Sequence, residues 1–221
     1  MANNMVIAID GPAGAGKSTI AKRLAKLLNI SYLDTGAMYR ALTLKALRAQ
    51  VDLENESQLV SLAQQTSINL MPSENGLKII MDQEDVSEQI RTTDVTNNTF
   101  YIARAPKVRE IMVQWQREIG SSQNVVAEGR DIGTVVFPRA SKKFYLDADL
   151  EERSHRRYKE FDEKGQTVDK DQVTIDLKDR DHKDFSRTVG PLKKAGDAIF
   201  IDSTNLSVEE VVEAMIKHIK D

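Results

Sequence analysis

The chain has 221 residues, of which 40% are hydrophobic and 29% charged, and its formal net charge is −3. This length suffices for one domain with insertions, and the slightly acidic balance gives no sign of nucleic acid or an acidic membrane as a partner. The chain contains no cysteine, which excludes disulfides, thiolate nucleophiles and thiolate metal sites. The first residues lack a basic region and a long apolar core, and no apolar run approaches the roughly 20 residues of a membrane span. We therefore expect a cytoplasmic protein.

The first predicted strand leads into a glycine-rich segment. An apolar run at 5–9 precedes Gly-Pro-Ala-Gly-Ala-Gly-Lys-Ser at 11–18, and a helical pattern follows at 19–28. The segment has the G-x-x-x-x-G-K-S spacing of a P-loop, in which main-chain N–H groups and a helix N-terminus surround a phosphate. Lys17 can reach the outer phosphates, and the Ser18 hydroxyl can ligate magnesium. A glycine-rich turn that binds nothing is the alternative, but the flanking strand and helix make it the weaker interpretation.

The following elements continue the alternation of strand and helix. A strand at 30–34 and a helical pattern at 37–49 are typical of a parallel sheet covered by helices. A second helical pattern runs from 94 to 119 and is interrupted at Pro106.

An insertion lies between the helical patterns at 37–49 and 94–119. Short apolar runs at 68–70 and 77–81 flank a turn-rich segment at 72–76, which predicts a β-hairpin. Because a hairpin does not fit within a parallel sheet, we interpret about 50–90 as an insertion.

The second half supplies the remaining core strands. Apolar runs at 124–128, 142–147 and 198–202 join those at 5–9 and 31–34, which gives five strands. The helices that we expect here lie at 150–164, 171–180 and 208–219, the last opened by a capping box at Ser207 and Glu210. A charged stretch follows the second of them and runs to Arg187. The pattern predicts an α/β protein with the three-layer P-loop NTPase fold, in which a five-stranded parallel sheet carries helices on both faces.

A P-loop alone does not identify an enzyme, because switches, transport ATPases and small-molecule kinases share it. The chain has no Asn-Lys-x-Asp motif, which counts against a GTPase switch. Asp34, Thr35 and Arg40 follow the second strand, which we expect beside the P-loop strand. Their position would bring a hydroxyl and an arginine near a phosphate acceptor, although a solvated helix residue is the alternative for Arg40.

Several segments resemble the bacterial cytidylate kinases, a family of nucleoside monophosphate kinases. The matching segments lie at 9–18, 34–40, 85–91, 129–138, 151–157 and 180–192, so they span nearly the whole chain in the expected order. The run Gly-Arg-Asp-Ile-Gly-Thr-Val-Val-Phe-Pro at 129–138 is the most specific of them. The resemblance implies three parts: a core (about 1–36, 92–150 and 188–221), a monophosphate-binding part containing a small antiparallel sheet (37–91) and a short helical lid (151–170).

The resemblance also implies the reaction, which is direct in-line transfer of the γ-phosphoryl group of ATP, with Mg²⁺, to CMP or dCMP in pyrimidine nucleotide metabolism. It implies ATP and CMP or dCMP as partners, without nucleic acid or membrane, and we expect a monomer. The catalytic residues implied are Lys17, Arg130, Arg153 and Arg187. The ATP-binding residues implied are Gly11, Pro12, Ala13, Gly14, Ala15, Gly16, Lys17, Ser18, Thr19 and Arg157, with Ser18 as the metal ligand. The acceptor-binding residues implied are Thr35, Arg40, Arg109, Arg130, Asp131, Arg180, Asp184 and Arg187.

The residue types suit these implied roles. An arginine fork pairs bidentately with phosphate oxygens, and phosphoryl transfer depends on positioning and charge neutralisation. By resemblance, Asp131 would accept from the cytosine amino group and Arg109 would donate to O2 and N3. A base with a carbonyl in place of that amine would lose the hydrogen bond and be repelled. Phe100 departs from the family, since relatives can carry a base-contacting hydroxyl there, and Glu128 stands where aspartate is common.

Some alternatives stay open at this point. The residues Arg153, Arg156 and Arg157 share one helix face, which is typical either of a salt-bridged surface helix or of a lid that closes onto ATP phosphates. Which of the three points inward does not follow from their spacing. The chain could also be a P-loop kinase for UMP, AMP or shikimate, or a non-catalytic nucleotide-binding switch. Convergence of Arg40, Arg130 and Arg187 near the P-loop would favour a kinase.

Overall fold

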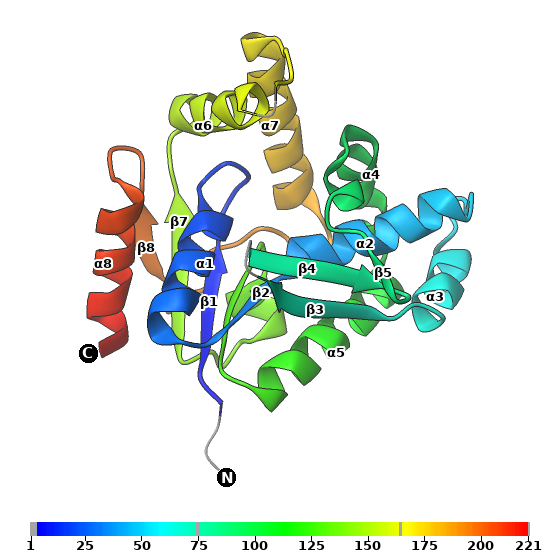
Figure 1. Ribbon diagram of the computed structural model, residues 1–221, viewed down its shortest axis with the longest axis horizontal. Coiled ribbons are helices and arrows are strands. Elements are labelled where there is room, and N and C mark those ends of the chain that lie inside the picture. The colour runs from blue at the N-terminus through cyan, green and yellow to red at the C-terminus, as the bar shows by residue number, and fades with distance from the viewer. Residues whose placement is uncertain (1–3, 74–75, 164, 221) are drawn as a thin grey trace. The chain divides into compact units, whose positions relative to one another are not determined.

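The computed structural model describes residues 4–73, 76–163 and 165–220 (Figure 1). Its larger sheet contains β1 (Val6–Asp10), β2 (Ser31–Asp34), β6 (Val125–Gly129), β7 (Lys142–Asp147) and β8 (Ile199–Asp202). The strand order is β2-β6-β1-β7-β8. Strand β1 pairs in parallel with β6 and β7, and β7 pairs in parallel with β8. All five predicted core strands are therefore present, and the predicted α/β fold class is confirmed.

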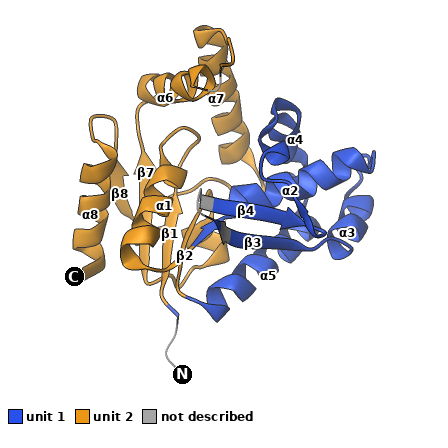
Figure 2. Cartoon of the chain, in the orientation of Figure 1, with its two compact units in different colours: residues 1–4, 32–123 blue, residues 5–31, 124–221 orange. Residues whose placement is uncertain are grey.

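The chain divides into two compact units (Figure 2). Unit 1 comprises residues 1–4 and 32–123, and unit 2 comprises residues 5–31 and 124–221. The helical pattern at 94–119, which we assigned to the core, lies in unit 1. The division into core, monophosphate-binding part and lid stays a prediction.

Unit 2 is organised around β1, whose five residues are all buried. Because a central parallel strand is covered on both faces, its sequence is a continuous run of apolar residues and does not alternate between apolar and polar ones. Helix α1 (Lys17–Leu28) packs against β6 and against α8 (Val208–Lys220). It buries Ile20 and Leu24, one helical turn apart. The capping box that we predicted before α8 is present, since the Ser207 main-chain N–H and hydroxyl both bond to the Glu210 carboxylate.

Two further helices of unit 2 pack against each other, α6 (Leu150–Asp162) and α7 (Lys170–Ser186). Helix α7 is longer than we predicted, because 181–186 continues the helix where we expected an irregular charged stretch. Its buried apolar residues are only Val173 and Leu177, both in its first half. The second half therefore carries no apolar periodicity by which a sequence pattern could extend it.

Unit 1 contains four α-helices among its described residues: α2 (Thr35–Arg48), α3 (Glu56–Gln64), α4 (Thr93–Arg104) and α5 (Pro106–Ser122). Pro106 begins α5, a position where its missing N–H has no intrahelical partner to lose. The predicted interruption at this proline is thus a boundary between two helices. Helix α2 packs against α4 and carries Ala37 and Ala41 into the core of the unit.

The predicted hairpin is present in unit 1 as the antiparallel pair β3 (Ile68–Ser73) and β4 (Gly76–Met81). Residues 74 and 75 of the predicted turn lie outside the described residues. A short third strand, β5 (Glu84–Asp85), extends the sheet and was not predicted. Ile79 and Met81 of β4 are buried against α2, which anchors this small sheet to the helices.

No helix in the described part of the chain combines the length and apolar character that crossing a membrane requires.

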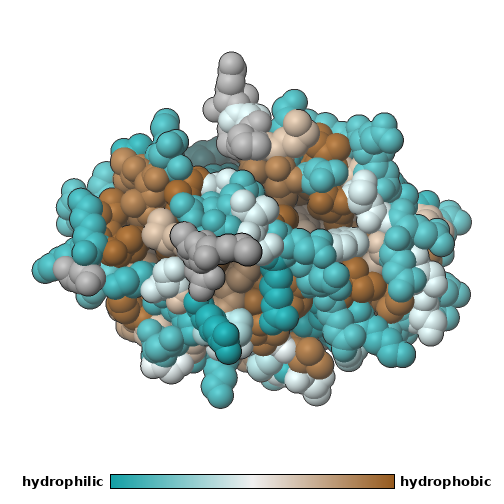
Figure 3. Space-filling view, turned by 90° about the horizontal axis from the view of Figure 1, so that it is seen from below, coloured by the Kyte–Doolittle hydropathy of each residue, from teal (hydrophilic) through white to brown (hydrophobic). Residues whose placement is uncertain are grey.

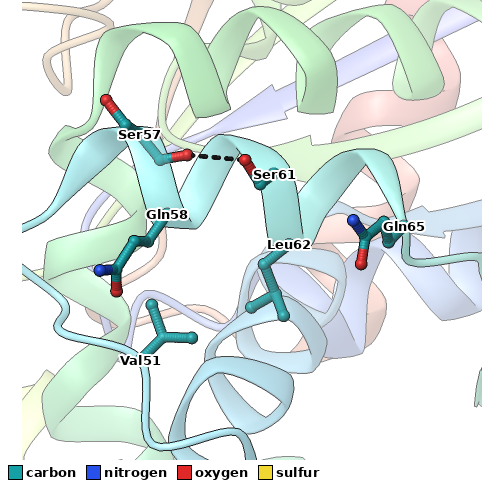
Figure 4. A pocket seen from close by; sticks show the side chains of 6 residues that line it. All are labelled: Val51, Ser57, Gln58, Ser61, Leu62 and Gln65. Carbon is teal, nitrogen blue, oxygen red and sulfur yellow. Dashed lines mark hydrogen bonds between the residues drawn. The ribbon is translucent and has the colours of Figure 1, made fainter.

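On the face drawn in Figure 3, hydrophobic side chains lie in patches between hydrophilic ones. A hollow on unit 1 is lined by uncharged side chains, four of them from α3 (Figure 4). These residues are Val51, Ser57, Gln58, Ser61, Leu62 and Gln65. Because the lining carries no charge, we assign no phosphate-binding role to this hollow.

Candidate active site

The segment at 11–18 connects β1 to α1 as the P-loop pattern predicts. Gly11 has φ of 151°, and a Cβ atom there would lie 1.9 Å from the Leu146 carbonyl oxygen of β7. Gly16 has φ of 88° and forms the N-cap of α1 in the left-handed region. Only glycine meets both demands without strain, so the spacing of the motif follows from the geometry of the turn.

Lys17 is 5% exposed, and its Nζ donates a hydrogen bond of 2.6 Å to the Pro12 carbonyl oxygen. Burial, followed by the positive charges of Arg130 and Arg180, lowers the pKa of Lys17 from 10.5 to about 7. Glu128 and Asp184 oppose this shift. Burial is the larger cause and the neighbouring positive charge adds to it, so both disfavour protonation of Lys17, which an incoming anion would reverse.

Three arginines of unit 2 gather around a single carboxylate. Arg130 Nε donates to Asp184 Oδ2 at 2.6 Å, and the two side chains are 17% and 15% exposed. The Arg187 Nη2 atom lies 4.0 Å from Asp184 Oδ1. Burial by itself would raise the pKa of Asp184, but Arg130, Arg180 and Arg187 together hold it below its usual value. Glu128 and Asp181 also act on Arg130, but the three guanidinium groups and Lys17 outnumber these carboxylates, so the cluster suits an anion such as a phosphate.

A pair of oxygen groups lies at the start of α1. The Ser18 hydroxyl donates to Glu128 Oε1, and Glu128 is 5% exposed near the end of β6, where strand pairing sets it beside Ile9. In the described residues there is no group of three histidine, cysteine or acidic side chains that could hold a metal ion by itself. Magnesium usually takes one or two protein oxygens and completes its shell with water and substrate phosphates. The Ser18–Glu128 pair therefore fits a magnesium ion that arrives with a nucleotide.

Helix α6 carries the three arginines whose direction the sequence left open. Arg153 is buried, and its guanidinium donates to the Ala13 carbonyl at 3.0 Å, the Ala148 carbonyl at 3.0 Å and Asp181 Oδ2 at 2.6 Å. A Cβ atom on Gly14 would lie 3.1 Å from Arg153, so the helix directly contacts the P-loop. Asp181 keeps one buried carboxylate oxygen without a hydrogen-bond partner among the described residues.

The other two arginines make different contacts. Arg156 Nη2 donates to the Ser203 carbonyl at 2.6 Å, and its Nε donates to Glu152 at 2.8 Å. Arg157 pairs with Glu160 at 2.6 Å and lies 4.5 Å above the Phe161 ring. Arg156 Nη1 also lies 3.5 Å from the Ala15 carbonyl oxygen, so both Arg153 and Arg156 point toward the P-loop, whereas Arg157 pairs within its own helix. The catalytic role of Arg153 and the ATP-binding role of Arg157 stay predictions.

The remaining predicted acceptor residues belong to unit 1, with the exception of Asp131, which is 5% exposed in unit 2. Asp34 caps α2 by accepting from the Ala37 N–H at 2.7 Å, and the same carboxylate lies 3.4 Å from Arg40 Nη2. Thr35, the first residue of α2, is buried. The predicted acceptor residues therefore come from both units, and the role of each of them stays a prediction.

Arg109 of α5 is buried in unit 1. Its Nη1 donates to the Ala103 carbonyl at 3.2 Å, and its guanidinium carbon lies 5.6 Å from the centre of the Tyr39 ring. The favourable contact of a guanidinium with an aromatic face is an ordinary way to hold a buried arginine in one orientation. The predicted base-reading role of Arg109 stays open beside this structural one.

Two carboxylates near the P-loop were not predicted as site residues, Asp10 and Asp181. Asp10 closes an otherwise apolar strand, and a charged residue in the last position of a buried strand is a signal that could have found it. Asp181 follows Arg180 in a run of charged residues, and nothing in that run distinguishes it from its neighbours.

A sequence model of the family described as cytidylate kinase matches residues 7–221. The chain belongs to the cytidylate kinase family. Cytidylate kinase from Anoxybacillus flavithermus is 51% identical, and the match covers 98% of this chain and 96% of that protein. Cytidylate kinase from Caldanaerobacter subterraneus is 50% identical, with 97% and 94% covered. The resemblance that the motifs predicted is confirmed.

A solved structure shares the fold at a much lower sequence identity. An uncharacterized protein from Eubacterium ventriosum superposes with a TM-score of 0.54 at 15% identity, and the match covers 98% of both chains. This likeness concerns the fold alone.

Proposed function

We propose that this member of the cytidylate kinase family transfers the γ-phosphoryl group of ATP directly to the 5′-phosphate of CMP or dCMP. The observation that carries the proposal is the cluster of Lys17, Arg130, Arg180 and Arg187 around Asp184. A site that binds only ATP needs the P-loop, whereas a site that joins two phosphorylated substrates must neutralise a second set of phosphate charges. Family membership does not favour another acceptor or a non-catalytic switch.

The chemistry in this scheme needs no covalent intermediate. The main-chain N–H groups of 14–19 and Lys17 hold the donor phosphates, and Arg130 and Arg187 hold the acceptor phosphate. Both sets then stabilise the charge that spreads over the transferred group, and their fixed positions replace the reorganisation that water would require. Lys17 bonds to the Pro12 carbonyl with one of the three N–H donors of its ammonium group, so the others could reach phosphate oxygens.

Magnesium accompanies ATP in this proposal. Ser18 and Glu128 would hold the ion, Ser18 through its hydroxyl and Glu128 directly or through a bound water. When bound, the ion supplies charge neutralisation of the phosphates. The hydrogen bond that Ser18 donates to Glu128 keeps the two oxygens together.

The finer assignments form part of the same proposal. Asp131 accepts a hydrogen bond from the cytosine amino group, and Arg109 donates to the other edge of the base. Thr35, Arg40, Arg180 and Asp184 complete the contacts to the acceptor. Arg153 and Arg157 act on the ATP side, and we propose a monomeric enzyme that acts in the cytoplasm.

The experiment measures ADP production from magnesium-ATP with CMP, dCMP, UMP, AMP and shikimate supplied separately. We expect strong stimulation by CMP and dCMP, weak stimulation by UMP and none by AMP or shikimate. Preference for another acceptor would retain the kinase and overturn the roles of Arg109 and Asp131. An ATP-binding protein that no acceptor stimulates would overturn the kinase proposal itself.

A further inference from the structure

Asp10 ends β1 immediately before the first glycine of the P-loop, yet its carboxylate is bound by a segment far away in the sequence. Oδ1 accepts from the Ile132 N–H and Oδ2 accepts from the Gly133 N–H, each at 2.7 Å. Asp10 is 3% exposed, so its carboxylate is buried. The two donors open the π-helix η2 (Ile132–Val136), which directly follows Arg130 and Asp131.

The packing of β1 does not require a carboxylate at this position. The four preceding strand residues are apolar and buried, and a buried carboxylate costs free energy unless hydrogen bonds compensate for lost water. Burial raises the pKa of Asp10 to about 6, and the two main-chain hydrogen bonds oppose that shift by favouring the ionised form. What the carboxylate contributes is therefore its hold on the two N–H groups.

These two bonds engage the first N–H groups of the turn, whereas the main-chain bonds of the turn engage the carbonyl oxygens of its first residues. The later N–H groups, those of Val135 and Val136, bond back to the Asp131 carbonyl. A Cβ atom on Gly133 would lie 3.3 Å from Asp10 Oδ2 and 3.1 Å from Lys143 Cδ, so the turn rests directly on the carboxylate. The course of the main chain just after Arg130 and Asp131 is thus set by Asp10.

We propose that Asp10 is a positioning residue, whose carboxylate fixes the start of η2 and thereby holds Arg130 and Asp131 in place beside the P-loop for the acceptor nucleotide. The proposal rests on the acceptor-binding role given above to Arg130 and Asp131. Asp10 itself contacts no substrate in this scheme and acts through the main chain. Loss of the Asp10 carboxylate should therefore weaken acceptor binding. Removal of a negative charge near Lys17 would by itself have the opposite effect and tighten the binding of anions.

The first measurement is amide hydrogen exchange in the ligand-free protein at pH 8, where the carboxylate is ionised. Asp10→Asn retains the shape of the side chain but turns an N–H donor toward one of the two main-chain donors. We expect exchange in 130–137 to accelerate by about tenfold or more, since a hydrogen bond to a charged group is lost. The matched control is Asp202→Asn, because Asp202 also ends a strand of the sheet and binds only its own turn, at Thr204. Asp202→Asn should leave exchange in 130–137 and turnover unchanged.

The second measurement separates acceptor binding from donor binding. For Asp10→Asn we expect the KM for CMP to rise about tenfold, while the Kd for ATP measured without CMP changes by less than about twofold. Gly133→Ala disturbs the same contact from the opposite side and leaves the Asp10 charge intact, so it should raise the KM for CMP in the same way. If Asp10→Asn fails to fold, Gly133→Ala still tests the positioning role. In an Arg130→Ala background, the effect of Asp10→Asn on the KM should shrink, because the two act through one turn.

Three results would contradict the positioning role. Unchanged exchange in 130–137 overturns it directly. Tighter binding of both CMP and ATP in Asp10→Asn assigns Asp10 a purely electrostatic effect and also overturns it. An equal loss of affinity for ATP and CMP places the effect in the P-loop instead. If CMP does not stimulate the wild-type protein, the proposed function fails, and the exchange rates still decide whether Asp10 holds the turn.

Discussion

If Lys17 binds ATP as proposed, we expect its charge state to make ATP binding a proton-linked event. Burial and the neighbouring arginines lower the pKa of this lysine to about 7 in the ligand-free protein. ATP phosphates would raise it again, since an opposite charge favours the protonated form. Lys17 must therefore take up a proton when ATP binds above pH 7, whereas below pH 7 it is protonated beforehand.

The magnitude follows from that pKa. At pH 8 about nine-tenths of the ligand-free molecules carry a neutral Lys17, so binding takes up about 0.9 proton, and at pH 6 about 0.1. Over the same interval the affinity for ATP should fall with rising pH, by as much as about tenfold per unit above pH 7. Titration calorimetry in two buffers of different ionisation enthalpy measures the proton uptake directly.

Lys17→Arg is the matched control, because the guanidinium keeps its charge throughout this range. Any proton that the nucleotide itself takes up is common to both proteins, so the difference between them isolates Lys17. Equal uptake by the two proteins at pH 8, or uptake by wild type that does not differ between pH 6 and pH 8, would refute this account of the site.

Three further predictions concern single residues. Arg130→Ala should lower turnover with CMP by about a hundredfold, which steady-state kinetics would measure. Thermal unfolding should show a change of less than about 1 kcal/mol in the free energy of unfolding, because Arg180 and Arg187 still offset the charge of Asp184. A variant with near-normal turnover would contradict the role of Arg130. Gly11→Ala should destabilise the fold by about 3 kcal/mol or more, since its Cβ would overlap the Leu146 carbonyl oxygen. Gly196→Ala serves as its control in denaturant unfolding, because a Cβ there meets nothing within 4 Å, and equal stability of the two variants would count against the overlap. Ser18→Ala should raise the magnesium concentration needed for half-maximal activity, measured at fixed ATP, and an unchanged magnesium requirement would remove Ser18 from the metal site.

Local patterns account for what could be predicted from the sequence. The turn that begins at Gly11 and ends at Gly16 is specified by residues within one loop, so its strand–loop–helix course follows from the motif. The hairpin of β3 and β4 is likewise a short-range feature, as is the helix boundary at Pro106. The gathering of Arg130 with Arg180 and Arg187 was anticipated only through the resemblance, because no spacing rule connects Arg130 with residues about 50 positions further along the chain.

The features that escaped prediction depend on contacts across the fold. The second half of α7 has no apolar periodicity, and its contacts are ion pairs with distant residues, Asp181 with Arg153 and Asp184 with Arg130. The hydrogen bonds from Ile132 and Gly133 to Asp10 join residues more than 120 positions apart. Arg153 likewise finds the Ala13 carbonyl 140 positions away. A pattern of three arginines on one helix face cannot distinguish such a buried contact from a surface ion pair.

The position of the Asp184 carboxylate among the arginines suggests a consequence for the end of the catalytic cycle. In the ligand-free molecule Asp184 is the counterion that moderates repulsion between Arg130, Arg180 and Arg187. We propose that Asp184 contacts the sugar of the acceptor, so its negative charge can at the same time weaken the hold of the arginines on a bound phosphate. Asp184 would then balance capture of the acceptor against release of the diphosphate product. An Asp184→Asn enzyme should let CDP go more slowly, which stopped-flow displacement would reveal as a lower dissociation rate.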